Sequence, residues 1–592
     1  MSIFIENTRC FIPLNEVKQQ MNSQSKDWSS CFDTQLSLCI QVEDEDYILA
    51  DDLPFYERLV KLNSHITEQD RQRFGKEGNL FSQFLKLSEH TAVYLPDRFA
   101  QKPLPAFVRN LFYYSEFIDN QLPPNSFSTR FELMEIIVVT YEQSIVNYMQ
   151  QVLHRKSELD RVRHLNFVNT ASYMGNKKKI AGFIIESMFP YVSENSIFID
   201  LMCGSGSMSQ AFAQLGPTYA SDAQEFCQLL AKIQGSGFSK LRAQQVLKDI
   251  APYYDQHLQV LTDLYREQIE AEEMLYHQDW SDRNAVFSAY KNFSNQFHLY
   301  SSTFPIEPEI NTLISQYKVN PKQFPYCLFT LYFSNIFFGL LQCIQLDSLR
   351  YAADHLSGEE KDWALGVLVV TAYQVSSSHA GHFAQPRKIS PSNILETLSQ
   401  RQKSAYHEFS KRFLCLAEES EKCQNKIKLI PGPWQNALEF VEKHIGKQAV
   451  IYLDAPYKRD EYSRYYHVLE TLVKYDYPFS ELNGRTRSKK MGERFSTEFF
   501  TKTSTKVDSI FVNILGQALA AGMTCVWSYS DNGIASIVDV LTSIKSLVPC
   551  KIHLYGIPYL HQSQRRNGRR LSVTEYCIVI SPLNRNEEPF TT

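Results

Sequence analysis

Two short segments of this chain carry the residue types best suited to chemistry. The first is Asp200–Gly206 (Asp-Leu-Met-Cys-Gly-Ser-Gly) and the second is Asp454–Tyr457 (Asp-Ala-Pro-Tyr). Glycines let the backbone approach a ligand closely, and an aspartate beside them can face a cationic or hydroxyl group. In the second segment a carboxylate and a backbone carbonyl can accept hydrogen bonds from an exocyclic amine, while the tyrosine can stack on a base. The pair predicts a nucleotide-type cradle beside a site for an amine-bearing base.

The elements around these segments are predicted to place both at one edge of a sheet. Uninterrupted apolar runs, Ile197–Ile199 and Ala449–Leu453, precede them and are typical of buried parallel strands. Met208–Leu215 follows the first segment and is predicted to be a helix. Ligands of open α/β sheets bind at the carboxyl ends of the strands. We therefore predict a doubly wound, Rossmann-like α/β fold with the site at that edge.

A second carboxylate supports the interpretation as a cofactor site. Tyr219–Asp222 predicts another strand that ends in an acid, where doubly wound folds bind ribose hydroxyls. Taken singly, the glycine segment is also compatible with an ordinary turn between strand and helix, and Asp-Ala-Pro-Tyr with a proline turn at a strand end. The combination favours a cofactor and a substrate at one site.

The motifs and their order resemble those of α-type DNA adenine-N6 methyltransferases, whose catalytic motif is Asp-Pro-Pro-Tyr. The resemblance also uses Tyr173–Lys177 (Tyr-Met-Gly-Asn-Lys), Trp527–Asp531 and Thr574–Ile580, and it covers about residues 168–235 and 440–582. It implies transfer of a methyl group from S-adenosylmethionine to N6 of adenine in double-stranded DNA, with sequence specificity and base flipping. Such a displacement needs alignment and charge stabilisation rather than a strong base.

The resemblance also implies roles for individual residues. The donor-binding set is Tyr173, Gly175, Lys177, Asp200, Cys203, Gly204, Gly206 and Asp222. The catalytic set is Asp454, Ala455, Pro456 and Tyr457, in which Asp454 stabilises the charge that builds on the amine.

Ala455 departs from the family, which has proline there. Alanine keeps the backbone carbonyl, and the lost φ restriction is worth less than about 1 kcal/mol, so activity is expected. Two alternatives stay open. One is a catalytically impaired methyltransferase fold that serves as a DNA-binding subunit of a restriction or defence assembly; the other is methylation of RNA or of a cytosine amine.

The length and the motif spacing predict four segments. With 592 residues, of which 44% are apolar, the chain can form several cores. We assign 1–165 to a mainly helical N-terminal domain of unknown role and 166–235 to the donor-binding half. Residues 236–440 form a mainly helical insert, because the distance between the motifs far exceeds a loop, and the family resemblance implies that this insert carries target recognition. Residues 441–592 form the catalytic half.

One apolar stretch, Phe324–Leu346, is long enough to cross a bilayer and carries no charged side chain. Ser334, Asn335, Gln342 and Gln345 interrupt it, so a buried helix is the favoured interpretation.

Basic residues gather after the catalytic motif and near the C-terminus. The net charge of −5 is not that of a wholly basic nucleic-acid binder. Local clusters nevertheless favour DNA phosphate contacts over solvated loops; their members are Arg464, Arg485, Arg487, Lys489, Lys490, Arg565, Arg566, Arg569 and Arg570. Next to Arg464 we expect stacking or wedge groups for a flipped base at Tyr462, Tyr465, Tyr466 and His467.

Neither metal nor membrane binding is predicted. The 12 cysteines lack Cys-x-x-Cys and zinc-type spacing, and Cys203 is interpreted as a packing residue. His379 and His382 are expected to make loop hydrogen bonds or to contact DNA. Met1–Phe11 lacks the apolar core of a signal peptide, so we expect a cytoplasmic protein, with restriction or defence proteins as candidate partners.

Overall fold

The computed structural model describes most of the chain beyond residue 160. The described residues are 161–162, 164–168, 170, 173, 175–296, 315–317, 319–378, 381–457, 462–476, 497–530, 532–566 and 569–583. Only the backbone is described for Pro190 and for residues 294–296, 556–566 and 569–574. Before residue 161, the description is limited to the backbone of five short strands.

An eight-stranded sheet is the centre of the fold, with the strand order β5-β11-β12-β10-β9-β6-β7-β8. Its strands are β5 (Thr91–Tyr94), β6 (Ile197–Asp200), β7 (Thr218–Ala220), β8 (Ile427–Leu429), β9 (Ala449–Leu453), β10 (Thr524–Ser530), β11 (Cys550–Arg566) and β12 (Arg569–Pro582). The five strands from β10 to β8 run parallel, whereas β12 is antiparallel to β10 and β11. The predicted α/β class with a mainly parallel sheet is confirmed.

The two predicted motif strands are neighbours at the middle of this sheet. β6 pairs with β9 in a parallel register that places Ile197 opposite Ala449 and Asp200 opposite Tyr452. Both strands are almost fully buried, as their apolar runs predict. Since parallel strands share one carboxyl edge, the turns after Asp200 and after Leu453 lie side by side.

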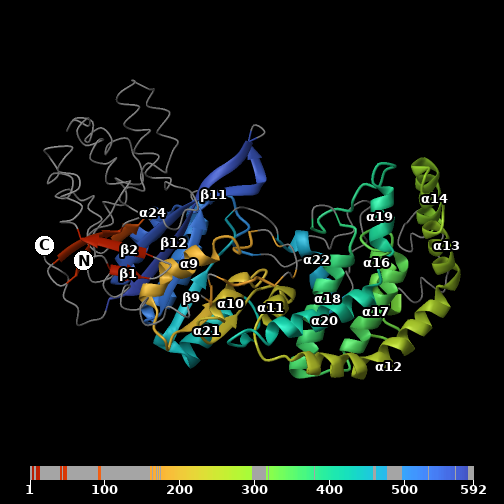
Figure 1. Cartoon of the computed structure of the whole chain (residues 1–592), viewed down its shortest axis with the longest axis horizontal. Coiled ribbons are helices and arrows are strands. Elements are labelled where there is room, and N and C mark those ends of the chain that lie inside the picture. The colour runs from red at the N-terminus through yellow and green to blue at the C-terminus, as the bar shows by residue number, and fades with distance from the viewer. Residues whose placement is uncertain are drawn as a thin grey trace, which may run out of the picture.

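Helices cover both faces of the sheet (Figure 1). They are α9 (Ala181–Met188), α10 (Ser207–Phe212), α11 (Glu225–Lys232), α21 (Trp434–His444), α23 (Ser504–Ala520) and α24 (Ile537–Leu547). Alternate strand residues point to opposite faces. Accordingly, Ile199 and Ile451 share an apolar cluster with α23 and α24, whereas Phe198 and Val450 belong to a second cluster with α9 and α10.

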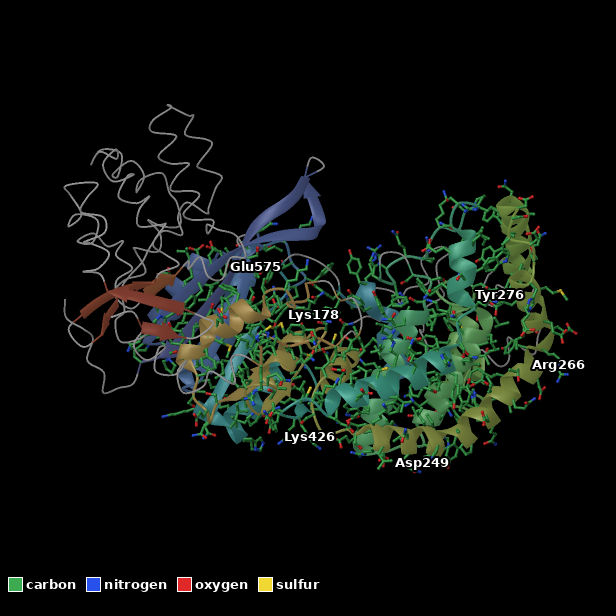
Figure 2. All side chains as sticks on the ribbon, viewed as in Figure 1. Lys178, Asp249, Arg266, Tyr276, Lys426 and Glu575 are labelled. Atoms are coloured by element: carbon green, nitrogen blue, oxygen red, sulfur yellow. The ribbon has the colours of Figure 1, made fainter. Side chains whose placement is uncertain are left out.

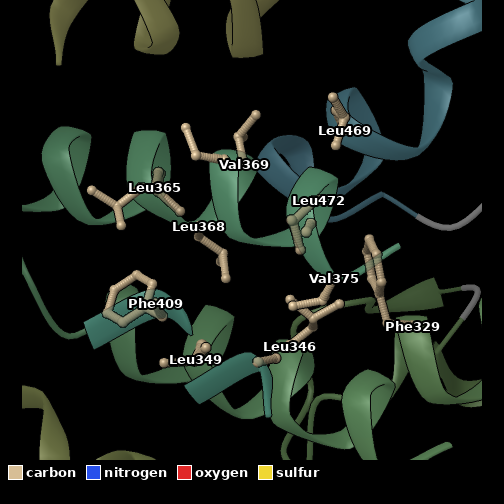
Figure 3. Packing of buried hydrophobic residues seen from close by; sticks show 14 of the residues in the cluster. Phe329, Leu346, Leu349, Leu365, Leu368, Val369, Val375, Phe409, Leu469 and Leu472 are labelled. Carbon is tan, nitrogen blue, oxygen red and sulfur yellow. The ribbon is translucent and has the colours of Figure 1, made fainter. Parts of the chain in front are cut away.

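A large group of helices separates β7 from β8 in the sequence. These are α12 (Lys240–Leu264), α13 (Arg266–Tyr276), α14 (Arg283–Gln296), α16 (Leu328–Phe333), α17 (Leu340–Ala353), α18 (Gly358–Val375), α19 (Ile394–Arg401) and α20 (Ala405–Ser420). Figure 1 shows them at the end of the molecule opposite β1 and β2. Their core is apolar, with Leu346, Leu368 and Phe409 among the buried side chains (Figure 3). The same core includes Leu469 and Leu472 of α22 (Tyr462–Lys474), which follows the catalytic motif.

The stretch Phe324–Leu346 is largely buried but is not one helix, so that part of the prediction is wrong. The chain leaves α16 at Ser334, and Asn335 takes a left-handed φ of 61° before α17 begins. Asparagine tolerates this conformation better than most residues, and it ends helices. Within the described ranges, no helix is both long and apolar enough to cross a membrane.

The described part of the N-terminal region consists of strands. β1 (Ile3–Ile5), β2 (Arg9–Pro13), β3 (Ile40–Val42) and β4 (Glu45–Leu49) form an antiparallel sheet, and β5 joins the central sheet beside β11. The prediction of a mainly helical region did not include these strands, since runs of three to five residues are too short for their periodicity to be recognised. The helix predicted at Phe131–Met149 lies outside the described residues.

Candidate active site

The turn after β6 is built on two glycines with left-handed backbone angles. Gly204 has a φ of 50° and Gly206, the residue before α10, has a φ of 76°. A Cβ on Gly204 would lie 2.8 Å from Cε1 of Tyr173, and one on Gly206 would lie 2.5 Å from Cα of Ala231. Neither position has room for a side chain. At Gly204 this lets the ring of Tyr173 pack directly on the turn.

Two carboxylates flank this turn, of which Asp200 is buried and Asp222 is half-buried. Ser209 donates a hydrogen bond to Oδ2 of Asp200 at 2.6 Å, whereas Oδ1 of Asp200 is buried without a hydrogen-bond partner among the described residues. Oδ2 of Asp222 accepts from the Gly204 backbone at 3.0 Å, and Oδ1 accepts from the Gln224 backbone at 2.9 Å. Burial raises the pKa of Asp200 to about 7 and that of Asp222 to about 6.

Aromatic rings form the wall next to the turn. The ring of Tyr173 stacks on Tyr466 at 4.6 Å and on Tyr462 at 5.6 Å between centroids. Tyr466 is buried by this stack, and His467 is buried with its Nε2 3.0 Å from the Phe383 carbonyl oxygen. The prediction that these two residues offer a wedge to a flipped base is therefore wrong; Tyr466 supports the pocket wall instead.

The predicted catalytic motif, Asp454–Tyr457, contacts Lys177 at the carboxyl end of β9. Nζ of Lys177 lies 3.3 Å from Oδ1 of Asp454 and 3.3 Å from Oε2 of Glu575 on β12. It also donates a hydrogen bond to Oη of Tyr457, and Tyr457 in turn donates to Oε2 of Glu575 at 2.9 Å. Figure 2 shows Glu575 near the base of the β11–β12 hairpin. Lys177, predicted for the donor pocket, thus contacts the catalytic motif directly.

Neighbouring charges oppose the effect of burial on the pKa values of Asp454 and Lys177. Burial raises the pKa of Asp454 to about 6, although the positive charge of Lys177 acts in the opposite direction. Burial by itself lowers the pKa of Lys177, but the carboxylates of Asp454 and Glu575 outweigh it and raise that pKa overall. Lys177 is therefore an ammonium ion at neutral pH. Burial also keeps the Tyr457 hydroxyl protonated by raising its pKa.

The two motifs share one cavity of about 510 Å³. Of the predicted residues, those that line it are Tyr173, Gly175, Lys177, Asp200, Cys203, Gly204, Asp222, Asp454, Ala455, Pro456, Tyr457 and Tyr462. Gly206 lies behind the wall at the start of α10. Cys203 is nearly buried, and burial raises the pKa of its thiol, in agreement with its interpretation as a packing residue.

Several cavity residues were not predicted. Trp434, Gln435, Glu498 and Phe499 line the cavity, and the Trp434 indole donates to Oε1 of Glu498 at 2.7 Å. No motif marks them. Glu575 lies in the segment Thr574–Ile580, which resembles the family's closing strand, but that resemblance carries no role for it.

The predicted DNA-binding residues fall into three groups. Arg464 is exposed on α22. Arg485, Arg487, Lys489 and Lys490 lie outside the described residues. Arg565, Arg566, Arg569 and Arg570 end the β11–β12 hairpin, where Arg565 pairs with Arg570 and Arg566 with Arg569. Figure 1 shows this hairpin extending beyond the rest of the sheet.

The described residues contain no group of three or more His, Cys, Asp or Glu side chains that could hold a metal ion. Nδ1 of His382 lies 3.3 Å from the Ala384 backbone nitrogen, which donates to it. His379 lies outside the described residues.

Comparison with known proteins finds a family model that matches part of the chain. Residues 173–324 match the family model described as D12 class N6 adenine-specific DNA methyltransferase. The predicted family resemblance is confirmed. The matched stretch contains the donor turn and Asp222, and it ends before Asp454.

A curated relative matches part of the chain. It is the type II methyltransferase M.FokI of Planomicrobium okeanokoites, which is 27% identical over 147 residues. These residues are 25% of this chain and 21% of that protein, so the match spans about a fifth of the relative's length. No solved structure matches the chain.

Proposed function

We propose that this chain transfers a methyl group from S-adenosylmethionine to the N6 amine of adenine in double-stranded DNA. The observation that carries the proposal is a single cavity lined by both the glycine turn and Asp454–Tyr457. A donor and an acceptor held in one cavity can react without diffusing, which is the main requirement of a methyl displacement. The match to D12 class N6 adenine-specific DNA methyltransferases supports the same reaction.

The residues of the turn fit a donor of this kind. The cavity of about 510 Å³ lies within the usual range of ligand sites, roughly 300–1,000 Å³. The unpaired, buried Oδ1 of Asp200 suits an ammonium or hydroxyl group, and Asp222 suits ribose hydroxyls. Tyr173 would cover the adenine ring from the stacked wall. When bound, S-adenosylmethionine supplies a methyl carbon activated by the adjacent positive sulfur.

The catalytic residues orient and stabilise the acceptor. The carboxylate of Asp454 and the carbonyl of Ala455 accept hydrogen bonds from the amine, which directs the nitrogen lone pair toward the donor. The ionised Asp454 also stabilises the positive charge that develops on the nitrogen. Tyr457 offers an aromatic face to an adenine extruded from the duplex.

DNA contacts are proposed for the surfaces outside the cavity. The four hairpin arginines and the exposed Arg464 are suited to DNA phosphates, because a guanidinium group can donate two parallel hydrogen bonds to one phosphate. The helices α12–α20 are proposed to carry target recognition.

The variant Asp454→Asn tests the proposal. It keeps the shape of the side chain but removes its charge, so kcat is expected to fall by about 10²–10³ while donor binding stays within about twofold. Asp222→Asn is the matched control, for which weaker donor binding is expected. Methylation by Asp454→Asn at the wild-type rate would contradict the proposed role of that residue.

A further inference from the structure

We propose that Glu575 is a positioning residue for methyl transfer, which acts on Asp454 through a shared lysine, Lys177. The inference rests on the proposed function and adds a role for a side chain to which the family resemblance assigns none. Glu575 does not line the cavity, whereas Asp454, Lys177 and Tyr457 do. Glu575 therefore acts on the reaction through these neighbours and not by touching the substrate.

The contacts of Glu575 join three parts of the chain. Its Oε2 lies 3.3 Å from Nζ of Lys177 and accepts from Oη of Tyr457 at 2.9 Å. Nζ of Lys177 also lies 3.3 Å from Oδ1 of Asp454. One ammonium group is thus held between two carboxylates, one from β12 and one from the turn after β9.

The two carboxylates differ in their exposure. The side chain of Glu575 is 2% exposed, whereas that of Asp454 is 18% exposed and borders the cavity. Burying a carboxylate costs free energy that an apolar residue on this inner strand would not incur. Here the contacts of Glu575 with Lys177 and Tyr457 offset this cost, and Lys177 in turn contacts Asp454. This arrangement indicates a role at the site rather than in the folding of the sheet.

Glu575 controls how strongly Lys177 neutralises Asp454. With both carboxylates present, the lysine charge is divided between them, and Asp454 keeps negative charge for the amine. Without the charge of Glu575, Lys177 would pair with Asp454 alone. The charge available to stabilise the developing cation would fall, and kcat with it.

The same arrangement predicts opposite shifts in the pH profile. The groups facing Asp454 are Lys177, Glu575, Tyr457, Asp200 and Tyr452. Activity needs the ionised Asp454, so kcat falls as the pH decreases through its pKa of about 6. The negative charge of Glu575 raises that pKa and the positive charge of Lys177 lowers it. Removing Glu575 must therefore move the acid limb to lower pH, and removing Lys177 must move it to higher pH.

The experiment measures kcat from pH 5 to pH 9, with saturating donor and DNA, for the wild type, Glu575→Gln, Glu575→Asp and Lys177→Met. For Glu575→Gln we expect a loss of about tenfold in kcat, little change in either KM, and an acid limb at lower pH. Glu575→Asp keeps the charge and should return the acid limb toward that of the wild type. Lys177→Met should lose more activity and move the acid limb to higher pH.

Controls separate this role from a merely structural one. Asp508→Asn exchanges another hydrogen-bonded carboxylate, which accepts from the Ser536 backbone at 2.8 Å, and should leave kcat and its pH profile unchanged. Calorimetry of donor binding without DNA, together with thermal unfolding, should give wild-type values for Glu575→Gln. A folded Glu575→Gln with wild-type kcat and acid limb overturns the inference. A wild type that binds the donor but transfers no methyl group overturns the proposed function instead.

Discussion

At the scale of single residues, Gly204 and Tyr173 are proposed to determine how closely the donor is enclosed. The ring of Tyr173 lies where a side chain on residue 204 would be, and it is held there by Tyr462 and Tyr466. The glycine turn after β6 and the ring of Tyr173 are therefore one unit, although about 30 residues separate them in the sequence.

Gly204→Ala tests this unit. The new Cβ would meet Tyr173 at 2.8 Å, and alanine at a φ of 50° costs about 1–2 kcal/mol. We expect donor affinity, measured by calorimetry, to fall at least about tenfold. Gly182→Ala on α9 is the matched control, since its Cβ would have no neighbour within 4 Å. Wild-type affinity in Gly204→Ala would show that Tyr173 does not cover the donor.

Replacing Ala455 with proline tests whether the Asp-Ala-Pro-Tyr motif limits turnover. The side chain is 2% exposed and belongs to the apolar cluster beneath the motif. Because the carbonyl is the group used, we expect Ala455→Pro to change kcat by less than about tenfold. Steady-state methylation assays measure this. A much larger gain would favour the impaired-subunit alternative.

The sequence predicted the residues of the site that belong to local motifs. Asp454 and Asp200 were expected at one sheet edge because each follows an apolar run, and they line one cavity. Glu575 and Trp434 could not be found in this way. Their positions depend on how β12 aligns with β10 and on where α21 begins, and no local pattern in a single sequence encodes either.

At the scale of elements, α22 connects the helical region to the site. Arg350 of α17 donates to the carbonyls of Leu472 and Val473 at 3.0 and 3.1 Å, and its Nη1 lies 2.7 Å from Oδ2 of Asp354. These bonds satisfy carbonyls at the end of α22, which otherwise have no partner within the helix. Glu470 of the same helix accepts from the first backbone amides of α11, at 3.3 and 3.2 Å. The helix that carries Tyr462 is therefore fixed by both neighbours.

Arg350→Met should destabilise this connection. It leaves two buried carbonyls without their donor and removes one of the cations beside Asp354, which keeps Lys361 and Tyr326 as partners. The expected cost is about 3 kcal/mol in the free energy of unfolding. Chemical denaturation measures the change. Arg266→Ala serves as the control, because its ion pair with Asp263 is exposed and is worth less than about 1 kcal/mol. Equal stability of the two variants would argue against the connection through α22.

Strands and helices are predictable from the sequence where an uninterrupted apolar run determines them. β6 and β9 followed from their uninterrupted apolar runs. The break between α16 and α17 did not, because it depends on one asparagine in a left-handed conformation inside an apolar stretch. Strands as short as β1 and β3 carry too few residues for a periodicity.

At the scale of the whole molecule, the hairpin that carries the arginines projects away from the body of the sheet. In Figure 1 the β11–β12 hairpin projects from the middle of the molecule, and the helices of the insert lie at the end opposite β1 and β2. The net charge of −5 means that attraction to DNA must come from local groups such as the hairpin arginines.

Replacing Arg565 and Arg570 with serine tests the hairpin as a DNA contact. We expect weaker DNA binding, and a dependence of log K on log salt that is shallower by about 2, since each lost phosphate contact removes about 0.9. Donor affinity should not change. Lys422→Ser, which removes a largely exposed lysine on the helical side, is the control. An unchanged salt dependence in the double variant would exclude the hairpin from the interface.

The identity of the methylated nucleoside tests the central claim most directly. The chain is incubated with S-adenosylmethionine carrying a labelled methyl group and with unmethylated double-stranded DNA, which is then digested to nucleosides and separated. The predicted result is label in N6-methyladenine, lost in Asp454→Asn. Label in a cytosine derivative, or no label although the donor binds, would contradict the account.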